Sequence, residues 1–303
     1  MFSILFPYSY VAIGIGLLIG IGITAVTLGC MSAVFGLVLI YAGIVRITPI
    51  IDFLTGLLHR LFPEQVKAIQ KNIYESFKIR FTEPIPEDTN YIYAWHPHGV
   101  ISMSHFFHIL TPFTAWPNTL KPIQCTTLAA LLWLPFAKEV FEYIHAIPSE
   151  YHAMKGVLEK RESISLAVGG MREMLGNSYI VKKRRGIFKM ALETGTPIVP
   201  VLSFGENTLF SLVEVSPQIQ KFLESYDICI CIPTLHSVRK WLGILQNPLK
   251  DPITSVAGKP IPVQRIKEPT EGDIAELRER YIAALKDLFL RENSNPNEQF
   301  SVI

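Results

Sequence analysis

Two histidines separated by a proline are the residues of this sequence best suited to chemistry. The apolar run 91–95 ends in His96, Pro97, His98 and Gly99. An apolar run that stops at a Pro-Gly turn is typical of a buried strand whose carboxyl end opens at the edge of a sheet. Because the pKa of histidine lies close to physiological pH, a histidine held by such a turn is a candidate general base.

A structural role and a metal site are the alternatives for this pair. A lone histidine in an apolar setting is more often a core residue than a catalyst, but the doublet and its rigid turn favour a functional site. His-x-His can place two nitrogens on one metal ion, yet the binuclear zinc pattern needs Asp and His where this chain has Val100 and Ile101. His105 and His108 stand one helical turn apart, accompanied by no carboxylate or cysteine, so we expect packing or groove lining. We therefore predict no metal.

The elements that must position these histidines follow a strand and helix alternation. Ile164–Val168 is a second strand-like run, stopped by a pair of glycines, and Ile198–Phe204 is a third. Before the third run the pattern predicts a helix over 187–193, closed by Gly195. Such alternation implies a largely parallel sheet with helices on both faces and with ligands at the carboxyl ends of the strands.

Two further features of the sequence could bind an anion. Glycines at a strand end let backbone N–H groups face a ligand, so Gly169 and Gly170 form either an oxyanion or phosphate cradle or a plain tight turn. Four consecutive cationic residues have three possible roles: a solvated turn, a patch that binds a membrane surface, or a phosphate-binding site. We favour the phosphate-binding site because these four residues lead directly into the N-terminus of the predicted helix. The cations are Lys182, Lys183, Arg184 and Arg185.

The carboxyl-terminal part predicts one more strand and a long helix. The segment 254–263 contains prolines at positions 260 and 262, which suggests a strand at the edge of the sheet. Residues 271–291 carry apolar side chains at helical spacing and predict an amphipathic packing helix. Residues 292–303 form a tail.

The amino-terminal part is unusually apolar. Hydrophobic residues make up 49% of the 303 residues, and the mean hydropathy is +0.30. The excess is concentrated in residues 1–45, which carry no charged side chain, a run much longer than the ~20 residues of one spanning helix. We predict a retained membrane anchor over 1–46, as a hairpin of two transmembrane helices or as one tilted helix. Residues 47–90 then form an interfacial or linker helix region.

The net charge, the cysteines and the absence of glycosylation acceptors bear on the binding partners and on the cellular compartment. A net charge of +2 gives no case for nucleic acid. The four cysteines show neither a CxxC pair nor a disulfide framework. The sequence has no Asn-x-Ser/Thr acceptor, which fits a domain that faces the cytosol.

Five blocks of the sequence, in order and spacing, resemble the diacylglycerol acyltransferase type 2 family, which includes monoacylglycerol and wax-alcohol acyltransferases. The first is the His-Pro-His-Gly signature. The others are a Gly-Gly-x-x-Glu block, a basic-Gly-aromatic helix, a Val-Pro-x-x-x-Phe-Gly-Glu strand and a Gly-x-Pro-hydrophobic block. They lie at His96–Gly99, Val168–Glu173, Arg184–Leu192, Val199–Glu206 and Gly258–Pro262.

The resemblance implies an α/β fold of the glycerolipid-acyltransferase type over 91–291, with an N-terminal transmembrane helical hairpin. It implies an enzyme of the endoplasmic reticulum membrane, its catalytic domain facing the cytosol, that moves a fatty acyl group from acyl-CoA to the hydroxyl of diacylglycerol. Acyl-CoA is a co-substrate, and no cofactor is expected. A monoacylglycerol or a wax alcohol is an alternative acceptor, and a non-catalytic membrane-anchored lipid-binding protein is the alternative outside enzymes. The oligomeric state stays open.

For this reaction we expect His98 to be the base, with Glu173 fixing its tautomer and His96 positioning it or sharing its role. The oxyanion donors are expected among the backbone N–H groups near Gly99 or near Gly169 and Gly170. The cations are expected to hold the phosphates of CoA. The full set of expected substrate-binding residues is Lys182, Lys183, Arg184, Arg185, Phe204, Glu206 and Asn207.

Two other acyl-transfer schemes fit the sequence less well. Cys125 and Ser104 are candidate nucleophiles for a covalent route, but nothing beside them in the sequence activates them. Acyltransferases that act on glycerol-3-phosphate or lysophospholipids carry His-x-x-x-x-Asp. Here the residues five positions after the two histidines are Ile101 and Met103.

Overall fold

The computed structural model of the chain describes residues 57, 60–100, 102–110, 123–133, 138, 141, 146–170, 173, 179–213, 216, 218, 233–295 and 299–303. The chain divides into a smaller compact unit, Met1–Ala68 with Thr127–Ser149, and a larger one, Ile69–Thr126 with Glu150–Ile303. The anchor predicted over 1–46 lies outside the described residues. None of the helices in the described ranges is both long enough and apolar enough to cross a bilayer.

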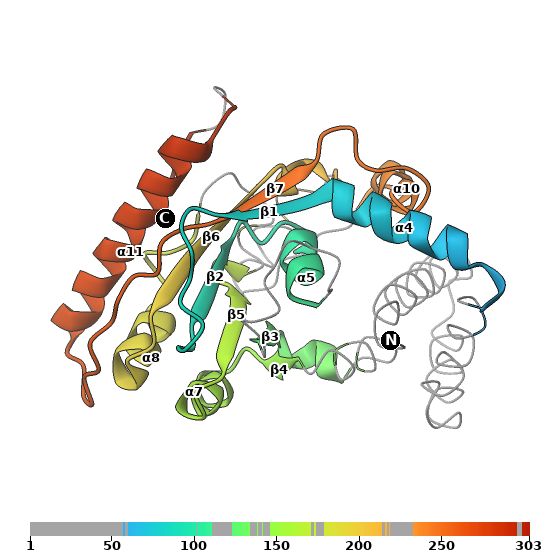
Figure 1. Ribbon diagram of the computed structural model, residues 1–303. Helices are drawn as coiled ribbons and strands as arrows, with labels where there is room; N and C mark the ends of the chain where they lie inside the picture. Colours follow the sequence, from blue (N-terminus) through green and yellow to red (C-terminus); the bar gives the residue numbers. More distant parts are fainter. Residues whose placement is uncertain are drawn as a thin grey trace. The chain divides into compact units, whose positions relative to one another are not determined.

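A mostly parallel sheet of seven strands is the framework of the fold (Figure 1). The larger unit holds the strands in the order β1-β7-β6-β2-β5-β3, and the two-residue strand β4 belongs to the smaller unit. In this order β6 and β7 are antiparallel, and the other neighbours are parallel. The strands are β1 (Phe77–Phe81), β2 (Ile92–His96), β3 (Ile123–Thr127), β4 (Ile147–Pro148), β5 (Ser163–Ala167), β6 (Ile198–Phe204) and β7 (Ile253–Ala257).

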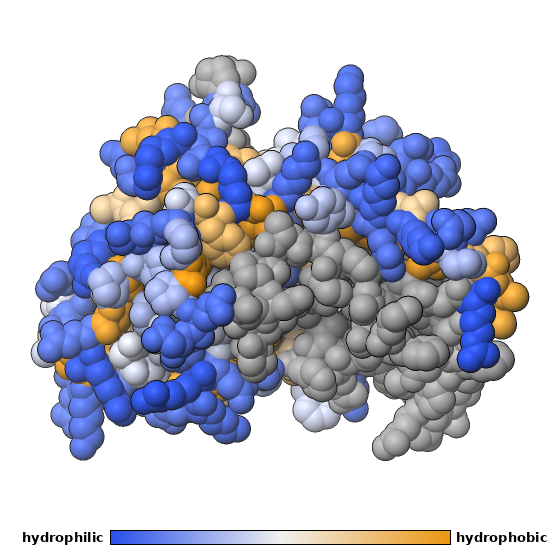
Figure 2. All heavy atoms as spheres, viewed as in Figure 1, coloured by the Kyte–Doolittle hydropathy of each residue, from blue (hydrophilic) through white to orange (hydrophobic). Residues whose placement is uncertain are grey.

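Helices cover both faces of the sheet in the larger unit. One face carries α7, which packs on β5 and α8, together with α11, which packs on β6 and α8. The opposite face carries α5, which contacts β1 and β7 (Figure 1). In the view of Figure 2 the described surface over α11, α8 and α7 is mainly hydrophilic, as expected for the outer sides of amphipathic helices. The helices are α4 (Pro63–Ser76), α5 (Met103–Leu110), α7 (Tyr151–Glu159), α8 (Gly186–Thr194), α10 (Leu235–Gly243) and α11 (Glu271–Glu292), with the short η2 (Ala129–Leu132) and η4 (Glu206–Thr208).

The predicted α/β class and its largely parallel sheet are confirmed. The strand-like runs at 91–95, 164–168 and 198–204 correspond to β2, β5 and β6. The helix predicted over 187–193 is α8, and Gly195 ends it with a φ of 72°, a left-handed conformation that glycine adopts without a steric cost.

The prediction that the proline-containing segment 254–263 forms a sheet edge is wrong. β7 lies between β1 and β6, and the strand ends at Ala257, before both prolines. Beyond that point the chain stays beside β6 through two reciprocal hydrogen bonds. The N–H of Ile261 donates to the oxygen of Ile198 at 2.8 Å, and the N–H of Ile198 donates to the oxygen of Ile261 at 3.2 Å. The prolines therefore stand outside the ladder, where a missing N–H costs nothing.

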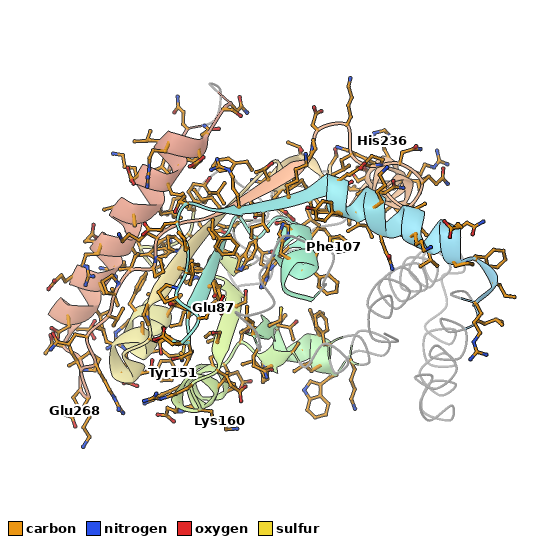
Figure 3. All side chains as sticks on the ribbon, in the orientation of Figure 1. Glu87, Phe107, Tyr151, Lys160, His236 and Glu268 are labelled. Atoms are coloured by element: carbon orange, nitrogen blue, oxygen red, sulfur yellow. The ribbon has the colours of Figure 1, made fainter. Side chains whose placement is uncertain are left out.

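The side of β2 that faces α5 is a packed aromatic layer. The ring of Trp95 lies 5.2 Å from the ring of His105 and 6.0 Å from that of His108, measured between centroids. Phe107, labelled in Figure 3, packs from α5 against Phe77 of β1 with a centroid distance of 4.6 Å. These contacts fix α5, and with it the end of the segment that joins β2 to α5.

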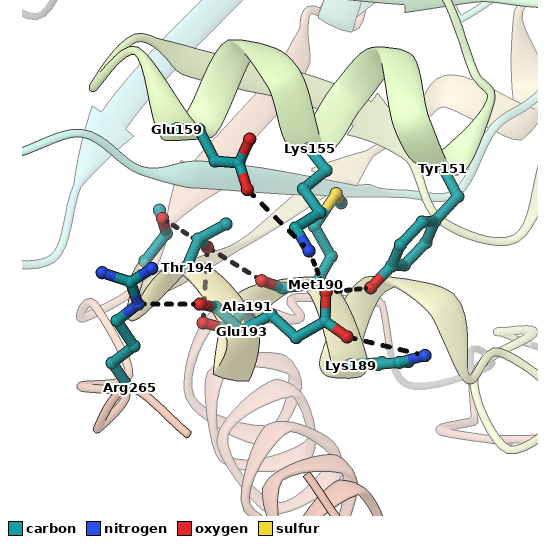
Figure 4. Close-up of polar contacts among 10 residues, drawn as sticks. Tyr151, Lys155, Glu159, Lys189, Met190, Ala191, Glu193, Thr194 and Arg265 are labelled. Carbon is teal, nitrogen blue, oxygen red and sulfur yellow. Dashed lines mark hydrogen bonds and ion pairs between the residues drawn. The ribbon is translucent and has the colours of Figure 1, made fainter. Parts of the chain in front are cut away.

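A polar cluster joins α7 to α8 away from that segment (Figure 4). The carboxylate of Glu193 accepts hydrogen bonds from the hydroxyl of Tyr151 at 2.7 Å and from the ammonium of Lys155 at 2.5 Å. Lys189 lies 3.5 Å from the other carboxylate oxygen. Arg265 donates to the backbone oxygen of Glu193 at 3.0 Å. Glu193 thus links two helices and the loop before α11.

Candidate active site

Three adjacent parallel strands, β6, β2 and β5, end at the same edge of the sheet. Trp95 of β2 pairs with Ala167 of β5 and with Val201 of β6. Because the strands are parallel and in register, the segments that follow them are brought together at their carboxyl ends. The predicted position of the histidines at this edge is confirmed. The side chains that converge there are His98 after β2, Glu173 after β5 and Glu206 after β6.

His96, the last residue of β2, is fully buried on the side of the sheet that faces α8 and α11. Its Nδ1–H donates to Oε1 of Glu173 at 2.7 Å, and its Nε2 accepts from the hydroxyl of Tyr281 at 3.0 Å. Burial and the nearby charge of Glu173 raise the pKa of Tyr281 well above its ordinary value, so this phenol keeps its proton. Both ring nitrogens of His96 are therefore occupied, and the ring can position its neighbours but cannot bind a substrate hydroxyl.

His98 follows the cis peptide bond between His96 and Pro97 and is only half-buried. Its Nδ1 lies 2.8 Å from the carbonyl oxygen of Gly99. A carbonyl oxygen only accepts hydrogen bonds, so Nδ1 carries the proton and Nε2 carries the lone pair. Among the described residues no group bonds to that Nε2. Burial lowers the pKa of His98, against the opposing effects of the Gly99 carbonyl and the charge of Glu173, so the ring is neutral near pH 7 and its Nε2 can accept a proton.

Glu173 is fully buried and holds this turn through three hydrogen bonds. Besides the ring of His96, its carboxylate accepts from the backbone N–H of His98 at 3.0 Å and from that of Ile180 at 2.8 Å. We expected Glu173 to fix the tautomer of His98 by bonding to its ring. The structure differs, because the carbonyl of Gly99 already bonds to that ring and Glu173 reaches the backbone of His98 instead.

The glycine pair after β5 makes room for Glu173. A Cβ on Gly169 would lie 1.9 Å from Cδ of Glu173, far inside contact distance. On the other side Arg184 donates to the carbonyl oxygen of Gly169, and a Cβ on Gly170 would lie 3.3 Å from Nη2 of Arg184. On the side where a Cβ would project, both glycines are therefore covered by protein, Gly169 by Glu173 and Gly170 by Arg184. The N–H of Gly99, the other expected oxyanion donor, donates to no group within the ranges that the structure describes.

Glu206 is buried after β6 rather than open to a substrate. Its Oε1 accepts from the N–H of Met103 at 2.7 Å and its Oε2 from the N–H of Ser104 at 3.2 Å, at the start of α5. Burial raises the pKa of the Glu206 carboxyl to about 7, against the opposing effect of the hydrogen bonds from Ser104 and Met103. Of the two neighbours expected to contact substrate, Phe204 is half-buried beside the ring of Phe289, whereas Asn207 is exposed.

The four consecutive cations divide into two pairs. Arg184 turns inward to the carbonyl oxygen of Gly169, and Arg185 forms an exposed ion pair with Glu271. Lys182 and Lys183 are exposed, and neither has an ion-pair partner in the part of the chain that the structure describes. From the sequence we treated the four cations as one anion-binding patch. In the structure only Lys182 and Lys183 are left accessible to an anion.

The predicted packing role of the histidines on α5 is confirmed. Nε2 of His105 is hydrogen-bonded to the hydroxyl of Ser165 at 2.6 Å and lies 3.7 Å from the sulfur of Cys125. Burial lowers the pKa of His105 and of His108 to about 3, so both rings are neutral. Burial also raises the pKa of Cys125 to about 12, which makes this thiol a poor nucleophile. No group of three metal-binding side chains occurs among the described residues.

One contact of the site, from Tyr281, was missed by the sequence reasoning. Tyr281 occupies the apolar stripe of α11, four residues after Leu277 and four before Leu285. A tyrosine within a buried helical stripe needs a hydrogen-bond partner for its hydroxyl, and that requirement was the available signal. The partner is the ring of His96.

The site thus combines a half-buried histidine, on a turn at the carboxyl edge of parallel strands in an α/β fold, with two buried carboxyls that bond to the backbone on either side of the turn. Comparison with known proteins identifies the family of the chain. A family model described as diacylglycerol acyltransferase matches residues 60–300. The chain therefore belongs to the diacylglycerol acyltransferase family.

The chain is similar to several curated proteins of this family. It is 31% identical over 238 residues to the human diacylglycerol O-acyltransferase 2-like protein 6, covering 71% of this chain and 70% of that protein. It is 30% identical to diacylglycerol O-acyltransferase 2 of Xenopus tropicalis, over 71% of this chain and 64% of that protein. It is 29% identical to the mouse acyl-CoA wax alcohol acyltransferase 2, over 71% of this chain and 69% of that protein. Among solved structures, the 1-acyl-sn-glycerophosphate acyltransferase PlsC of Thermotoga maritima aligns over 86% of this chain and 90% of that chain, with a TM-score of 0.45 and 13% identity.

Proposed function

We propose that the chain is an acyl-CoA-dependent O-acyltransferase that esterifies the hydroxyl of diacylglycerol or of a related lipid alcohol. The observation that carries the proposal is the state of His98. Its tautomer is set by the carbonyl of Gly99, and its Nε2 lone pair is left without a partner among the described residues. Relatives named diacylglycerol O-acyltransferase 2 and wax alcohol acyltransferase 2 support the substrate class.

In the proposed reaction the acceptor hydroxyl gives its proton to Nε2 of His98 while its oxygen forms a bond to the thioester carbonyl carbon. The tetrahedral oxyanion accepts a hydrogen bond from the N–H of Gly99, a contribution of roughly 3 kcal/mol in enzymes of this kind. The carbon–sulfur bond then breaks and releases the ester. The imidazolium returns its proton to the CoA thiolate, so His98 is regenerated without an acyl-enzyme.

The phosphates of acyl-CoA are proposed to bind at Lys182 and Lys183. These side chains are exposed and lie within four residues of the start of α8. The two arginines between them and the helix are already engaged by the Gly169 carbonyl and by Glu271. Lys160, labelled in Figure 3, is an exposed lysine after α7, and reversing its charge is the control for reversing those of Lys182 and Lys183.

The smaller unit is proposed to meet the bilayer of the endoplasmic reticulum, with the catalytic unit on the cytosolic side. Residues 1–45 carry no charge, and residues 127–137 of the same unit carry none either. In that second run Trp133 is 84% exposed and Leu128 is 46% exposed, which would be costly in water but favourable in the lipid interface. Flotation of the full chain with liposomes tests this placement, and recovery of the protein only in the soluble fraction contradicts it.

The proposed reaction is tested with membranes that carry the full chain. Labelled oleoyl-CoA is offered with diacylglycerol, monoacylglycerol or a long-chain alcohol, and the products are separated by thin-layer chromatography. Replacing His98 by Ala should lower kcat by roughly 10²- to 10⁴-fold at unchanged expression. The matched control is His236→Ala, because His236 is an exposed histidine on α10 (Figure 3).

The outcomes separate the alternatives. Ester formed with one acceptor and lost in the His98 variant supports the reaction and names the acceptor. Binding of acyl-CoA without product from any acceptor would indicate a non-catalytic lipid-binding protein. Full activity of His98→Ala would remove this residue from the mechanism.

A further inference from the structure

The turn that carries His98 is held between two buried carboxyls, one from each strand that flanks β2. Glu173, after β5, accepts from the backbone N–H of His98 and so fixes the first part of the turn. Glu206, after β6, accepts from two N–H groups at the start of α5 and so fixes its last part. The proposed mechanism uses neither the Glu206 carboxyl nor the contacts that it makes.

Glu206 also touches the turn next to the proposed base. A Cβ on Gly99 would lie 2.9 Å from Cγ of Glu206, so only glycine lets the turn approach this side chain so closely. Gly99 has a φ of 60°, which glycine adopts without strain. Gly99 supplies the carbonyl that orients the ring of His98. Glu206 thus contacts both ends of the segment from Gly99 to Ser104 and sets the distance between them.

A buried chain of hydroxyls extends the same contact into the sheet. The hydroxyl of Ser104 donates to that of Ser203 on β6 at 2.9 Å, and the hydroxyls of Ser203 and Ser255 on β7 lie 2.9 Å apart. All three serines are buried. Polar groups inside a packed layer are bonded in one arrangement only, because an unpaired hydroxyl there loses its hydration without compensation. The start of α5 is therefore fixed relative to two strands.

We propose that Glu206 is a positioning residue for acyl transfer, which holds the Gly99 turn and the start of α5 so that Nε2 of His98 faces the acceptor hydroxyl. The inference rests on the proposed function and adds to it a residue that touches neither substrate. It replaces the sequence expectation that Glu206 binds substrate, since its carboxyl is buried and both of its oxygens accept from the backbone.

The protonation of Glu206 supplies a readout that a purely structural contact would not give. An ionised carboxyl accepts from both N–H groups, whereas a protonated one carries a hydrogen on one oxygen and accepts less well. Burial raises the pKa of this group to about 7, so the change falls within the range of an ordinary assay. The other titratable side chains of the turn and of α5 are His98, His105 and His108, and the last two are neutral throughout that range.

The test compares Glu206→Gln and Glu206→Ala with the wild type in the full chain. Kcat and KM for acyl-CoA and for the acceptor are measured from pH 5.5 to 8.5, with a thermal unfolding scan of each protein. Gln keeps one acceptor oxygen and Ala keeps none. At pH 8 we expect kcat to fall about 10-fold for Gln and about 100-fold for Ala, the scale of a small misplacement of the base, with KM within about twofold. The ratio of wild-type to Gln activity should shrink below pH 7, where Glu206 is itself protonated.

The matched control is Glu193→Gln, which makes the same chemical change in a mostly buried carboxylate that joins α7 to α8 (Figure 4). Its kcat and pH profile should follow the wild type. Ser203→Ala supplies a milder second variant, since it removes one hydroxyl of the buried chain. If the Gln protein does not fold, a severalfold loss of kcat at constant KM in Ser203→Ala carries the proposal, and wild-type kcat in Ser203→Ala overturns it.

Failure of this inference is distinct from failure of the proposed function. An inactive wild type refutes the acyl-transfer proposal itself. An active wild type with a Glu206→Gln variant of equal kcat and identical pH profile refutes the positioning role alone. A rise in the acceptor KM without a change in kcat would also refute it, because that result indicates a substrate contact.

Discussion

Replacing Gly169 by alanine should disable the site without touching any group that reacts. The new Cβ would lie 1.9 Å from Cδ and 2.1 Å from Oε1 of Glu173, so the carboxylate must move. In moving, it gives up one or two of its three bonds, which are to the ring of His96 and to the backbone of His98 and Ile180. The turn then loses the contact that fixes its first part.

The magnitude follows from two terms. Inserting a methyl group into a filled space costs about 1 to 3 kcal/mol. Each hydrogen bond to a charged group that is lost adds about 1.5 to 3 kcal/mol. With one or two bonds broken, we expect the free energy of unfolding to fall by about 2.5 to 9 kcal/mol, a large part of the ~5 to 15 kcal/mol that stabilises a typical domain.

Denaturant unfolding in detergent, followed by tryptophan fluorescence, measures this loss, and the oleoyl-CoA assay measures kcat on the same samples. Gly156→Ala is the matched control, because Gly156 lies within α7 and its new Cβ meets nothing within 4 Å. That control should keep its activity and gain about 0.5 to 1 kcal/mol, since alanine is the better helix former. A Gly169→Ala protein as stable and as active as the wild type would refute the fit of Glu173 against this glycine.

Three further variants test other contacts of the site. Tyr281→Phe leaves Nε2 of His96 unpaired in the core and should lower the free energy of unfolding by about 1 to 3 kcal/mol in denaturant titrations. Folding raises the pKa of Glu206 from 4.5 to about 7, so the folded state binds this proton more tightly than the unfolded state. The resulting stabilisation is complete below about pH 4.5 and is lost as the pH rises to about 7, a change of about 3 kcal/mol that Glu206→Gln should abolish in titrations at pH 5 and pH 8. Reversing the charge of Lys182 and Lys183 together should raise the KM for acyl-CoA by about tenfold with kcat unchanged, and an unaltered KM would place the phosphates elsewhere.

The strands and the helix that position the site were predictable because each is encoded locally. Continuous apolar runs between turn residues gave β2, β5 and β6, and the glycine after the helix gave the end of α8. The place of β7 was not predictable in this way. The prolines in segment 254–263 suggested a sheet edge, but they all follow Ala257, where β7 ends. The order of the strands depends on which distant strands pair with each other, and that is not encoded locally.

Which groups bond to which histidine was beyond the reach of the sequence for a related reason. His96 and His98 are two residues apart, and in a continuing strand their rings would point to the same face. The strand ends at His96, so the turn carries the two rings into different surroundings. The ring of His96 meets Glu173 and Tyr281 in the core, and the ring of His98 bonds to its own neighbour's carbonyl. The proposed roles, a buried positioning histidine and a half-buried base, therefore depend on where one strand ends. A spacing pattern cannot fix that end point to a single residue, because hydrogen bonds from β5 and β6 decide it.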